Sequence, residues 1–286
     1  ARTGNPEQLT AWQKTKVLFT GVNIPRPVNY STPVSLGIPF EIYQFSGKEG
    51  VSLEGWWIPS RLSSPRGIVV LFHGYAGCKA DLLQEAAGVH EMGYAAFLVD
   101  FRGSGGSSGS QTSIGVWEAD DVFSTCRFVQ ERWPNLPVAL FGQSMGSAAI
   151  LRAIAEFSIR PDCLILECPF DSLLSTVANR FQAMNLPSFP LSQLLVFWGG
   201  IQNGFNGFNH NPSEYAAKVQ CPVLMLHGEL DVRVTRAQAN NIFKKLPVDK
   251  EFQTFENVGH ASYIGVRPDE WKMGVKKFLN RYLQPH

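Results

Sequence analysis

The sequence shows no excess of charge of either sign. It contains 25 Lys and Arg against 24 Asp and Glu, which leaves a formal net charge of +1. Proteins that bind nucleic acid or an anionic membrane surface usually present a strongly basic patch, and a balanced composition does not indicate one. We therefore expect no nucleic-acid partner for this chain.

Long apolar runs are missing too, and cysteines are few. No stretch approaches the ~20 consecutive apolar residues that a membrane-spanning helix requires. The five cysteines are odd in number and lack the spacing of metal ligands, which excludes a disulfide scaffold and a zinc ribbon. They are Cys78, Cys126, Cys163, Cys168 and Cys221. Cys126, Cys163 and Cys221 fall in expected strands or helices, where we expect inert core thiols.

The sequence does contain an ordinary globular composition with a regular alternation of patterns. Of its 286 residues 44% are hydrophobic and 17% are charged, which is enough apolar material for a full core. Short continuous apolar runs, typical of strands buried on both faces, occur at 68–72, 95–99, 138–141, 164–166 and 223–226. Helix-like stretches lie between and after them, at 81–90, 116–133, 146–157, 235–245 and 268–282. This alternation predicts an α/β fold with a mostly parallel sheet covered by helices on both faces.

The first 60 residues depart from this alternation. The patterns at 40–45 and 55–59 alternate polar and apolar residues, which predicts antiparallel strands with one buried face. We therefore expect residues 1–60 to form an N-terminal extension with antiparallel strands at one side of the sheet.

A second departure lies between the third and fourth helix-like stretches. From 172 to 213 the only charged residue is Arg180, and the segment is rich in Phe and Leu but interrupted by Pro, Gly and Asn. It is too broken to span a membrane. We expect residues 172–219 to form a small apolar lid inserted into a core of residues 1–171 and 220–286.

Two pentapeptides match the G-x-S-x-G pattern of a nucleophilic serine, at 105–109 and 142–146. Ser144 in the second follows an apolar strand and precedes a helix rich in small residues, which is the context that a nucleophile elbow requires. Ser107 in the first lies in a loop of Gly and Ser with no apolar strand directly before it, and we interpret it as a flexible turn. We therefore predict that Ser144 is the nucleophile.

A serine hydroxyl is a poor nucleophile until a base accepts its proton, and His260 is our candidate base. It follows the last expected strand, 251–255, and precedes the last helix. Its loop should therefore end at the same sheet edge as Ser144, because parallel strands end together at their carboxyl edge. We expect His90, His210 and His286 to be solvated residues without a role.

An imidazole base needs a carboxylate on its other nitrogen to fix its tautomer and stabilise its charged form. Asp231 follows the apolar strand at 223–226 and is our candidate, with Asp171 and Glu229 as competitors. His227 lies between that strand and Asp231, where we expect it to brace the loop.

The oxyanion of the tetrahedral intermediate needs preorganised hydrogen-bond donors. We predict two backbone N–H groups for this role. One belongs to Met145, directly after the nucleophile at the start of a helix, and the other to Tyr75, in the glycine-bearing loop 73–77 after the first buried strand. An ordinary glycine-bearing turn is the alternative reading for Tyr75.

The order Ser144, Asp231, His260, together with the elbow and the loop 73–77, resembles the α/β-hydrolase superfamily over about residues 50–284. The run 100–109 looks like the D-x-R-G-x-G-x-S loop of a serine-hydrolase branch that includes Bem46-like proteins and acyl-protein thioesterase relatives. In that branch the loop is structural, and its Asp and Arg brace it. The resemblance implies hydrolysis of an ester or thioester through an acyl-enzyme, without a metal or organic cofactor.

The leading hypothesis is thus an enzyme that hydrolyses small acyl esters, thioesters or lysolipid-like substrates. The insertion would cover the acyl pocket, with candidate lining residues Phe181, Phe189, Phe197 and Trp198. A peptidase or amidase with the same triad is the alternative, and a non-catalytic binding protein of the same fold is a third reading. Many members of the branch carry an N-terminal membrane anchor, and because the sequence begins at Ala1 the compartment stays open, as does the oligomeric state.

Overall fold

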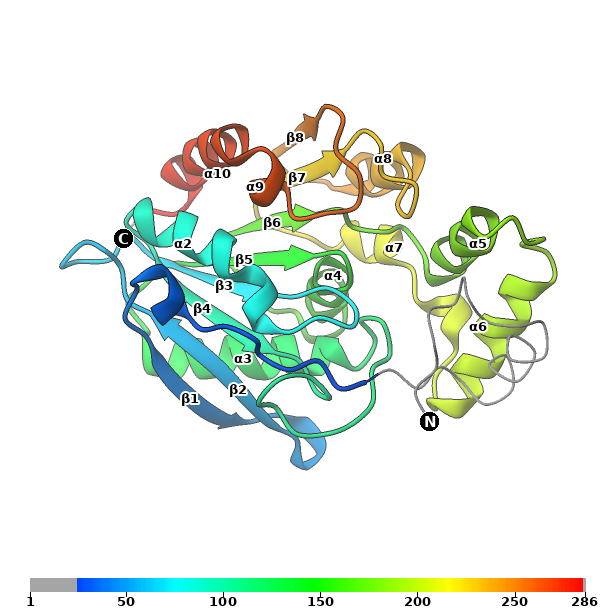
Figure 1. Ribbon diagram of the computed structural model, residues 1–286, viewed down its shortest axis with the longest axis horizontal. Helices are drawn as coiled ribbons and strands as arrows, with labels where there is room; N and C mark the ends of the chain where they lie inside the picture. The colour runs from blue at the N-terminus through cyan, green and yellow to red at the C-terminus, as the bar shows by residue number, and fades with distance from the viewer. Residues whose placement is uncertain (1–24, 285–286) are drawn as a thin grey trace.

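The computed structural model describes residues 25–284, which form one central sheet with helices packed on it (Figure 1). The eight strands are β1 (Glu41–Ser46), β2 (Ser52–Ile58), β3 (Ile68–Phe72), β4 (Ala95–Asp100), β5 (Val138–Gln143), β6 (Cys163–Glu167), β7 (Val223–Gly228) and β8 (Lys250–Phe255). Their order across the sheet is β1-β2-β4-β3-β5-β6-β7-β8. The short apolar runs of the sequence therefore form the middle of the sheet, where both faces are covered.

The pairing is parallel from β4 through β8 and antiparallel at the other edge. β2 pairs antiparallel with both β1 and β4, as expected for the N-terminal strands. In β1 the face that was expected to be buried is half-buried, and its side chains Tyr43 and Phe45 pack against Phe97 and Phe128. On the other face of β1, Ile42 is 59% exposed. The predicted α/β fold class with a mostly parallel sheet is confirmed.

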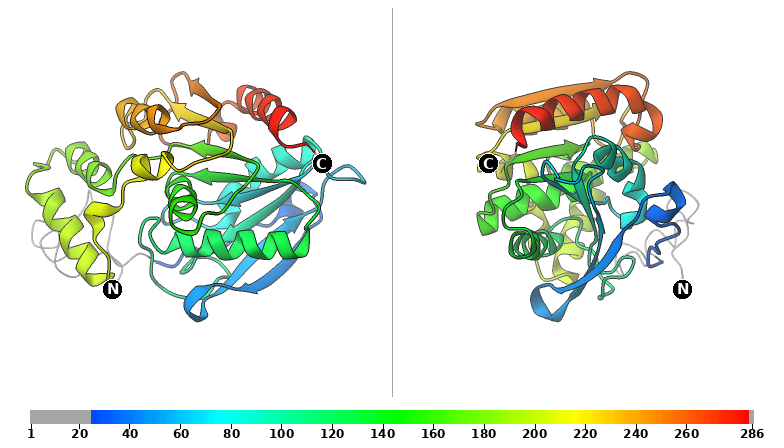
Figure 2. Two further views of the ribbon diagram at one scale, coloured as in Figure 1. Left: turned by 180° about the vertical axis from the view of Figure 1, so that it is seen from behind. Right: turned by 90° about the vertical axis from the view of Figure 1, so that its left-hand side faces the viewer.

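Helices cover both faces, as Figure 2 shows. One face packs against α2 (Leu83–Glu91), α9 (Tyr263–Val266) and α10 (Pro268–Tyr282), through buried side chains such as Trp271 and Phe278. The other face packs against α3 (Glu118–Arg132), α4 (Met145–Phe157) and α8 (Arg236–Lys245), through residues such as Ile150 and Ile242. The sheet is therefore the middle layer of three, and functional side chains must lie at one of its edges.

The segment between β6 and β7 stands partly apart from this core (Figure 1). It contains α5 (Leu173–Ala183), α6 (Leu191–Gln202), the short η5 (Gly207–Asn209) and α7 (Pro212–Ala216). α5 and α6 share a small apolar cluster of their own, built on Leu173, Val177, Phe181 and Val196. By contrast, α7 packs on α4 and α8 and belongs with the core layer.

The two ends of this insertion are joined by backbone hydrogen bonds. The N–H of Ser213 donates to the carbonyl of Asp171 at 3.0 Å, and the N–H of Leu173 donates to the carbonyl of His210 at 3.0 Å. The chain thus leaves the core and returns to it at one narrow neck. No helix among residues 25–284 has the length and apolar character that crossing a membrane requires.

Candidate active site

Ser144 occupies the turn between β5 and α4 with a strained backbone. Its φ of 50° and ψ of −107° lie in a region that side-chain-bearing residues rarely adopt, and such strain persists only where the surroundings enforce it. Its N–H donates to the carbonyl of Glu167 at 2.8 Å, which fixes the turn to the end of β6. The predicted strand–turn–helix setting of Ser144 is present at this position.

The two glycines of this pentapeptide are required by the space around them. A Cβ on Gly142 would lie 2.5 Å from the backbone nitrogen of Ser147, and one on Gly146 would overlap the carbonyl of Phe72. Both obstacles are backbone atoms, which cannot move away as a flexible side chain could. The close approach of β5, α4 and β3 that displays Ser144 therefore depends on glycine at both positions.

Ser107, in the other matching pentapeptide, has a structural position. Its side chain is 1% exposed, its Oγ donates to the carbonyl of Asp100 at 2.6 Å, and it accepts from the N–H of Glu54 at 2.9 Å. The expectation of a flexible turn is wrong, because these bonds hold the loop rigidly against β2. Arg102 braces the same loop through a 2.8 Å ion pair with Asp121.

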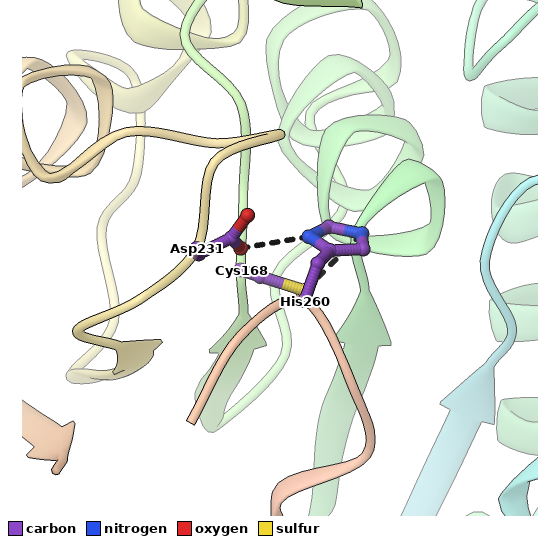
Figure 3. Close-up of side chains that lie close together, drawn as sticks. All are labelled: Cys168, Asp231 and His260. Carbon is purple, nitrogen blue, oxygen red and sulfur yellow. Dashed lines mark hydrogen bonds and ion pairs between the residues drawn. The ribbon is translucent and has the colours of Figure 1, made fainter. Parts of the chain in front are cut away.

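His260 and Asp231 meet above the carboxyl ends of β7 and β8. The imidazole Nδ1 lies 2.7 Å from Oδ2 of Asp231, as Figure 3 shows. The other carboxylate oxygen, Oδ1, accepts from the N–H groups of Arg233 and Val234, each at 2.8 Å. The carboxylate is thus held by the backbone on one side and fixes the imidazole on the other, which leaves Nε2 free to act as an acceptor.

The competing carboxylates are placed elsewhere. Asp171 accepts from Ser175, Gln238 and Asn241, which tie the neck of the insertion to α8. Glu229 is exposed on the surface of the loop. Of the three candidate carboxylates, the geometry favours Asp231 as the partner of His260.

Cys168 is a residue of the site that sequence reasoning missed. It follows β6 with a positive φ of 40°, and its Sγ lies 3.9 Å from Nε2 of His260 (Figure 3). Burial raises the pKa of this thiol well above its usual value, so that it stays protonated. Its position directly after the carboxyl end of a strand was the available signal, since Ser144 and Asp231 were found by that criterion.

Cys168, Asp231 and His260 are also the residues of the described part of the chain that could together approach a metal ion, with ligand atoms within 4.8 Å of one another. Two observations weigh against that use. Asp231 is already bonded to Nδ1 of His260 and to two backbone N–H groups, and a protonated thiol is a poor ligand. The donor set fits an oriented base better than a metal centre.

Cys168, His260 and Ser144 line one pocket of about 210 Å³. Its lining includes Tyr75, Ser144, Cys168, Arg180, Arg233 and His260. Within residues 25–284 no hydrogen bond joins the hydroxyl of Ser144 to His260, and such bonds often tighten only when substrate binds. The pocket therefore brings together the predicted nucleophile and base.

The insertion contributes a cation to this pocket rather than an aromatic wall. Phe181 is buried in the insertion's own cluster, and Phe189 and Phe197 are 74% and 49% exposed. Trp198 packs edge-on against Phe197. None of these four predicted lining residues is among the described residues that line the pocket, whereas Arg180 is.

The two predicted oxyanion donors lie beside Ser144. Met145 is the first residue of α4, so its N–H has no partner within the helix. The loop that carries Tyr75 is held by His73, whose Nδ1 lies 2.8 Å from the carbonyl of Gly74 and whose Nε2 accepts from the N–H of Phe101 at 3.1 Å. Burial lowers the pKa of His73, which keeps it neutral in this bridging position.

The remaining histidines differ from the expectations for them. His210 is buried, Ile114 accepts a 3.0 Å hydrogen bond from its Nε2, and burial lowers its pKa to about 3, so the expectation of a solvated residue is wrong. His90 is half-buried with Nδ1 2.8 Å from the carbonyl of Pro59. His227 is buried without a hydrogen-bond partner and only stacks on Phe252, so it does not brace the loop by hydrogen bonds. His286 lies outside the described residues.

Two buried carboxyls lie beneath the site. Glu167, next to Cys168, accepts from Gln143 at 3.1 Å and from the indole of Trp271 at 3.2 Å. Glu85 of α2 accepts from Ser262, two residues after His260, at 2.6 Å. Burial raises the pKa of Glu167 to about 8, with the charge of Glu85 adding to it, and burial raises the pKa of Glu85 to about 7.

Two family models match the chain. The model described as "Serine aminopeptidase, S33" matches residues 63–196, and that of the dienelactone hydrolase family matches residues 189–280. Together they cover the core strands and the insertion, including every residue of the pocket named above.

Relatives and solved structures agree with these matches. The uncharacterized protein YqkD of Bacillus subtilis is 27% identical over 66% of this chain and 63% of its own length. The lysophosphatidylserine lipase ABHD12 of mouse is 26% identical over 78% of this chain and 56% of its own, so the chain spans less than two thirds of both relatives. The esterase Pf2001 of Pyrococcus furiosus superposes with a TM-score of 0.76 at 24% identity, covering 92% of this chain and 98% of that one. At that identity the similarity concerns the fold.

Proposed function

Since the chain belongs to the α/β-hydrolase superfamily, we propose that it is a serine hydrolase that cleaves carboxylic esters through an acyl-enzyme. Ser144 is the nucleophile, His260 the general base and acid, and Asp231 the carboxylate that orients His260. The narrower resemblance to the Bem46-like and acyl-protein thioesterase-like branch stays a prediction.

The steps follow from the geometry of the pocket. Nε2 of His260 takes the proton of Ser144 as its Oγ attacks the ester carbonyl, and Asp231 stabilises the imidazolium that forms. The N–H groups of Tyr75 and Met145 donate to the oxyanion, each contributing roughly 10²–10³ in rate. The imidazolium then protonates the leaving alcohol, and a water activated by His260 releases the acyl group from Ser144.

One observation carries this proposal. His260 is held by Asp231 at 2.7 Å, and it faces the pocket that Ser144 enters from a strained turn. A structural serine would not require the crowded glycines at 142 and 146, and a surface histidine would not require a carboxylate fixed by two backbone N–H groups. Backbone strain of this kind is unfavourable for folding and is typical of functional sites, and nucleophilic catalysis by Ser144 is the function that accounts for it here.

An amidase or aminopeptidase is the second candidate, and the description of the first family model favours it. An aminopeptidase must hold the positively charged amino terminus of its substrate, for which a carboxylate is the usual partner. This pocket instead presents the guanidinium groups of Arg180 and Arg233, which repel an ammonium group. The electrostatics of the pocket therefore favour an ester over a peptide with a free amino terminus.

The size of the pocket bears on the acyl group. Its volume of about 210 Å³ lies below the roughly 300–1,000 Å³ of sites that enclose a drug-sized ligand. We therefore expect short acyl chains to be preferred over long ones. A lipid-like substrate, such as that named for the mouse relative, would leave most of its chain outside this pocket.

The two matching pentapeptides supply a matched pair of variants that tests this proposal. We expect Ser144→Ala to lower kcat/KM on p-nitrophenyl butyrate by ~10⁶ and to abolish labelling by a fluorophosphonate probe. Ser107→Ala should keep both activity and labelling per folded molecule, because the hydroxyl of Ser107 bonds only to backbone groups of β4 and β2, away from the pocket.

A series of p-nitrophenyl esters from acetate to dodecanoate, run beside the matching anilides, separates the two candidate functions. Turnover of short esters with little anilide cleavage supports the esterase. Activity confined to anilides would support the amidase, and an unlabelled, inactive but folded chain would contradict both.

A further inference from the structure

The single charged residue of the apolar insertion is directed to the catalytic pocket. Arg180 is the only Asp, Glu, Lys or Arg between residues 172 and 213. It lies in the last turns of α5, and its guanidinium carbon is 5.3 Å from the ring centroid of Tyr75, on the wall of the pocket that also carries Ser144. A charge placed there in an otherwise apolar segment calls for a chemical reason.

A second guanidinium reaches the same pocket from the core. Arg233 follows Asp231 on the loop after β7, and its backbone N–H is one of the two groups that hold the Asp231 carboxylate. Desolvation lowers the pKa of Arg180, and the positive charge of Arg233 acts in the same direction. Both arginines are also exposed to solvent, so two like charges face one small open pocket, where they repel each other weakly and attract an anion.

Neither guanidinium is neutralised by the described part of the protein. Among residues 25–284, no carboxylate lies within 4.0 Å of Arg180 or Arg233. Arg102, by contrast, is paired with Asp121 at 2.8 Å. Asp231, two residues before Arg233, is already bonded to His260 and to backbone N–H groups.

We propose that Arg180 and Arg233 form an anion-binding subsite, which holds a carboxylate or phosphate group of the substrate while its ester lies at Ser144. Guanidinium groups present planar donor forks that match both anions, and the two sources share this chemistry. The proposal rests on the proposed ester hydrolase function and names its substrate class as acidic acyl esters. It also gives the insertion a role in selectivity, since one of the two cations comes from α5.

Two pairs of matched substrates test the subsite and separate the two anions. Mono-p-nitrophenyl glutarate, which has a carboxylate at the end of the acyl chain, is compared with p-nitrophenyl pentanoate. Hexanoyl-glycerol 3-phosphate, which has a phosphate on the alcohol side, is compared with hexanoyl-glycerol. The measured quantity is the ratio of kcat/KM for the anionic ester over the neutral one, at low ionic strength and again in 0.5 M NaCl.

In the wild-type chain we expect a ratio of ~10 or more in at least one pair, lower in high salt because salt screens exposed charges. Arg180→Gln and Arg233→Gln should each lower that ratio about 10-fold, the effect of losing one charge-assisted hydrogen bond. Arg180→Lys should recover only part of it, because an ammonium lacks the planar fork. Arg127→Gln is the control, since Arg127 is an exposed partner of Glu131 on α3 and should leave the ratio unchanged.

Two results would overturn the subsite while leaving the hydrolase proposal standing. One is a wild-type ratio at or below 1 in both pairs of substrates. The other is a ratio that stays unchanged in the variants at Arg180 and at Arg233. If no ester is cleaved, the hydrolase proposal fails, and binding still decides the subsite. Calorimetric titration of Ser144→Ala with the phosphate ester and with hexanoyl-glycerol should then give at least ~10-fold tighter binding of the anion, lost on adding Arg180→Gln. Equal affinities for the two ligands would overturn it.

Discussion

The elbow around Ser144 and the insertion of α5 and α6 border one pocket, yet they are built in opposite ways. At the elbow, backbone meets backbone so closely that Gly142 and Gly146 admit no side chain, and the strain at Ser144 is enforced from three strands. In the insertion, the cluster of Leu173, Val177, Phe181 and Val196 is small. Its outer aromatics, such as Phe189, are exposed.

This difference separates what must be fixed from what can vary. The proposed transfer of a proton between Ser144 and His260 depends on placement within tenths of an ångström, which close backbone packing supplies. The proposed choice of substrate depends on charges at the pocket wall, which the inserted helix α5 and the loop after β7 both present. We therefore assign the proposed chemistry to the core, and the proposed selectivity jointly to the core and the insertion.

The largest expected effect that tests this comparison is on kcat, in variants of one carboxylate from each region. Asp231 belongs to the core and orients His260, whereas Asp171 ties the neck of the insertion to α8. We expect Asp231→Asn to lower kcat on p-nitrophenyl butyrate by ~10⁴, because an amide favours the wrong imidazole tautomer. Asp171→Asn should lower it by less than about tenfold, and stopped assays on both purified variants measure the difference.

A control must show that a loss of activity in either aspartate variant does not come from unfolding. Thermal unfolding of both variants reports whether either has lost its fold, so that a loss of activity can be assigned to chemistry. A severe loss in Asp171→Asn with little loss in Asp231→Asn would reverse the assignment of the carboxylate and place the catalytic contribution at the insertion.

A smaller effect compares two glycines, one from each region. In Gly146→Ala the new methyl would overlap the Phe72 carbonyl, and we expect a loss of ~1–3 kcal/mol in unfolding free energy. Gly199 lies inside α6, and a Cβ there meets nothing within 4 Å. Gly199→Ala should therefore stabilise the chain by up to ~1 kcal/mol, because alanine favours helix. Urea titrations of the two variants measure both changes, and equal destabilisation would contradict the comparison.

The smallest expected effect concerns the pH dependence of the unfolding free energy, which we attribute to two buried carboxyls of the core. Glu167 and Glu85, with pKa values raised to about 8 and about 7, stay protonated in the fold at pH values where an unfolded carboxyl near ~4.3 has lost its proton. The folded state therefore binds more protons, and the unfolding free energy falls as pH rises from about 4.5 to about 8.

Glu167→Gln tests this origin of the pH dependence. The variant keeps an oxygen acceptor for Trp271 but removes one titrating group, so its thermal midpoint should fall less steeply between pH 5 and pH 9 than that of the wild type. Glu131→Gln, at an exposed position on α3, should keep the wild-type slope. An unchanged slope in Glu167→Gln would place the titration elsewhere.

The same division between regions decides what the sequence could predict. The apolar run at 68–72 matches β3 residue for residue, and the pattern at 268–282 matches α10. A strand covered on both faces leaves a continuous apolar run, and an amphipathic helix that begins with proline leaves a helical periodicity. Ser144 could be chosen over Ser107 for a related reason, since an elbow requires a strand before it and a helix after it. These features depend on neighbours in the sequence.

Features that depend on distant contacts could not be predicted in this way. His210 was expected in solvent but is buried at the neck of the insertion, where its partner is the carbonyl of Ile114. Phe189 and Phe197 were expected in the pocket because they are apolar, but both are exposed outside it, and the exposed side of α5 places Arg180 on the pocket lining instead. Cys168 reaches His260 because β6 pairs with β7 and β7 pairs with β8, so that the loops after these strands meet at one edge of the sheet.

The narrow neck of the insertion has a practical consequence for engineering. A backbone hydrogen bond joins Asp171 and Ser213, so the segment between them leaves the core and returns to it at one place. Removing or exchanging this segment therefore needs no new connection across the core. A designer could transplant an excursion of similar span from another scaffold of this architecture and retain the elbow, the base and its carboxylate untouched.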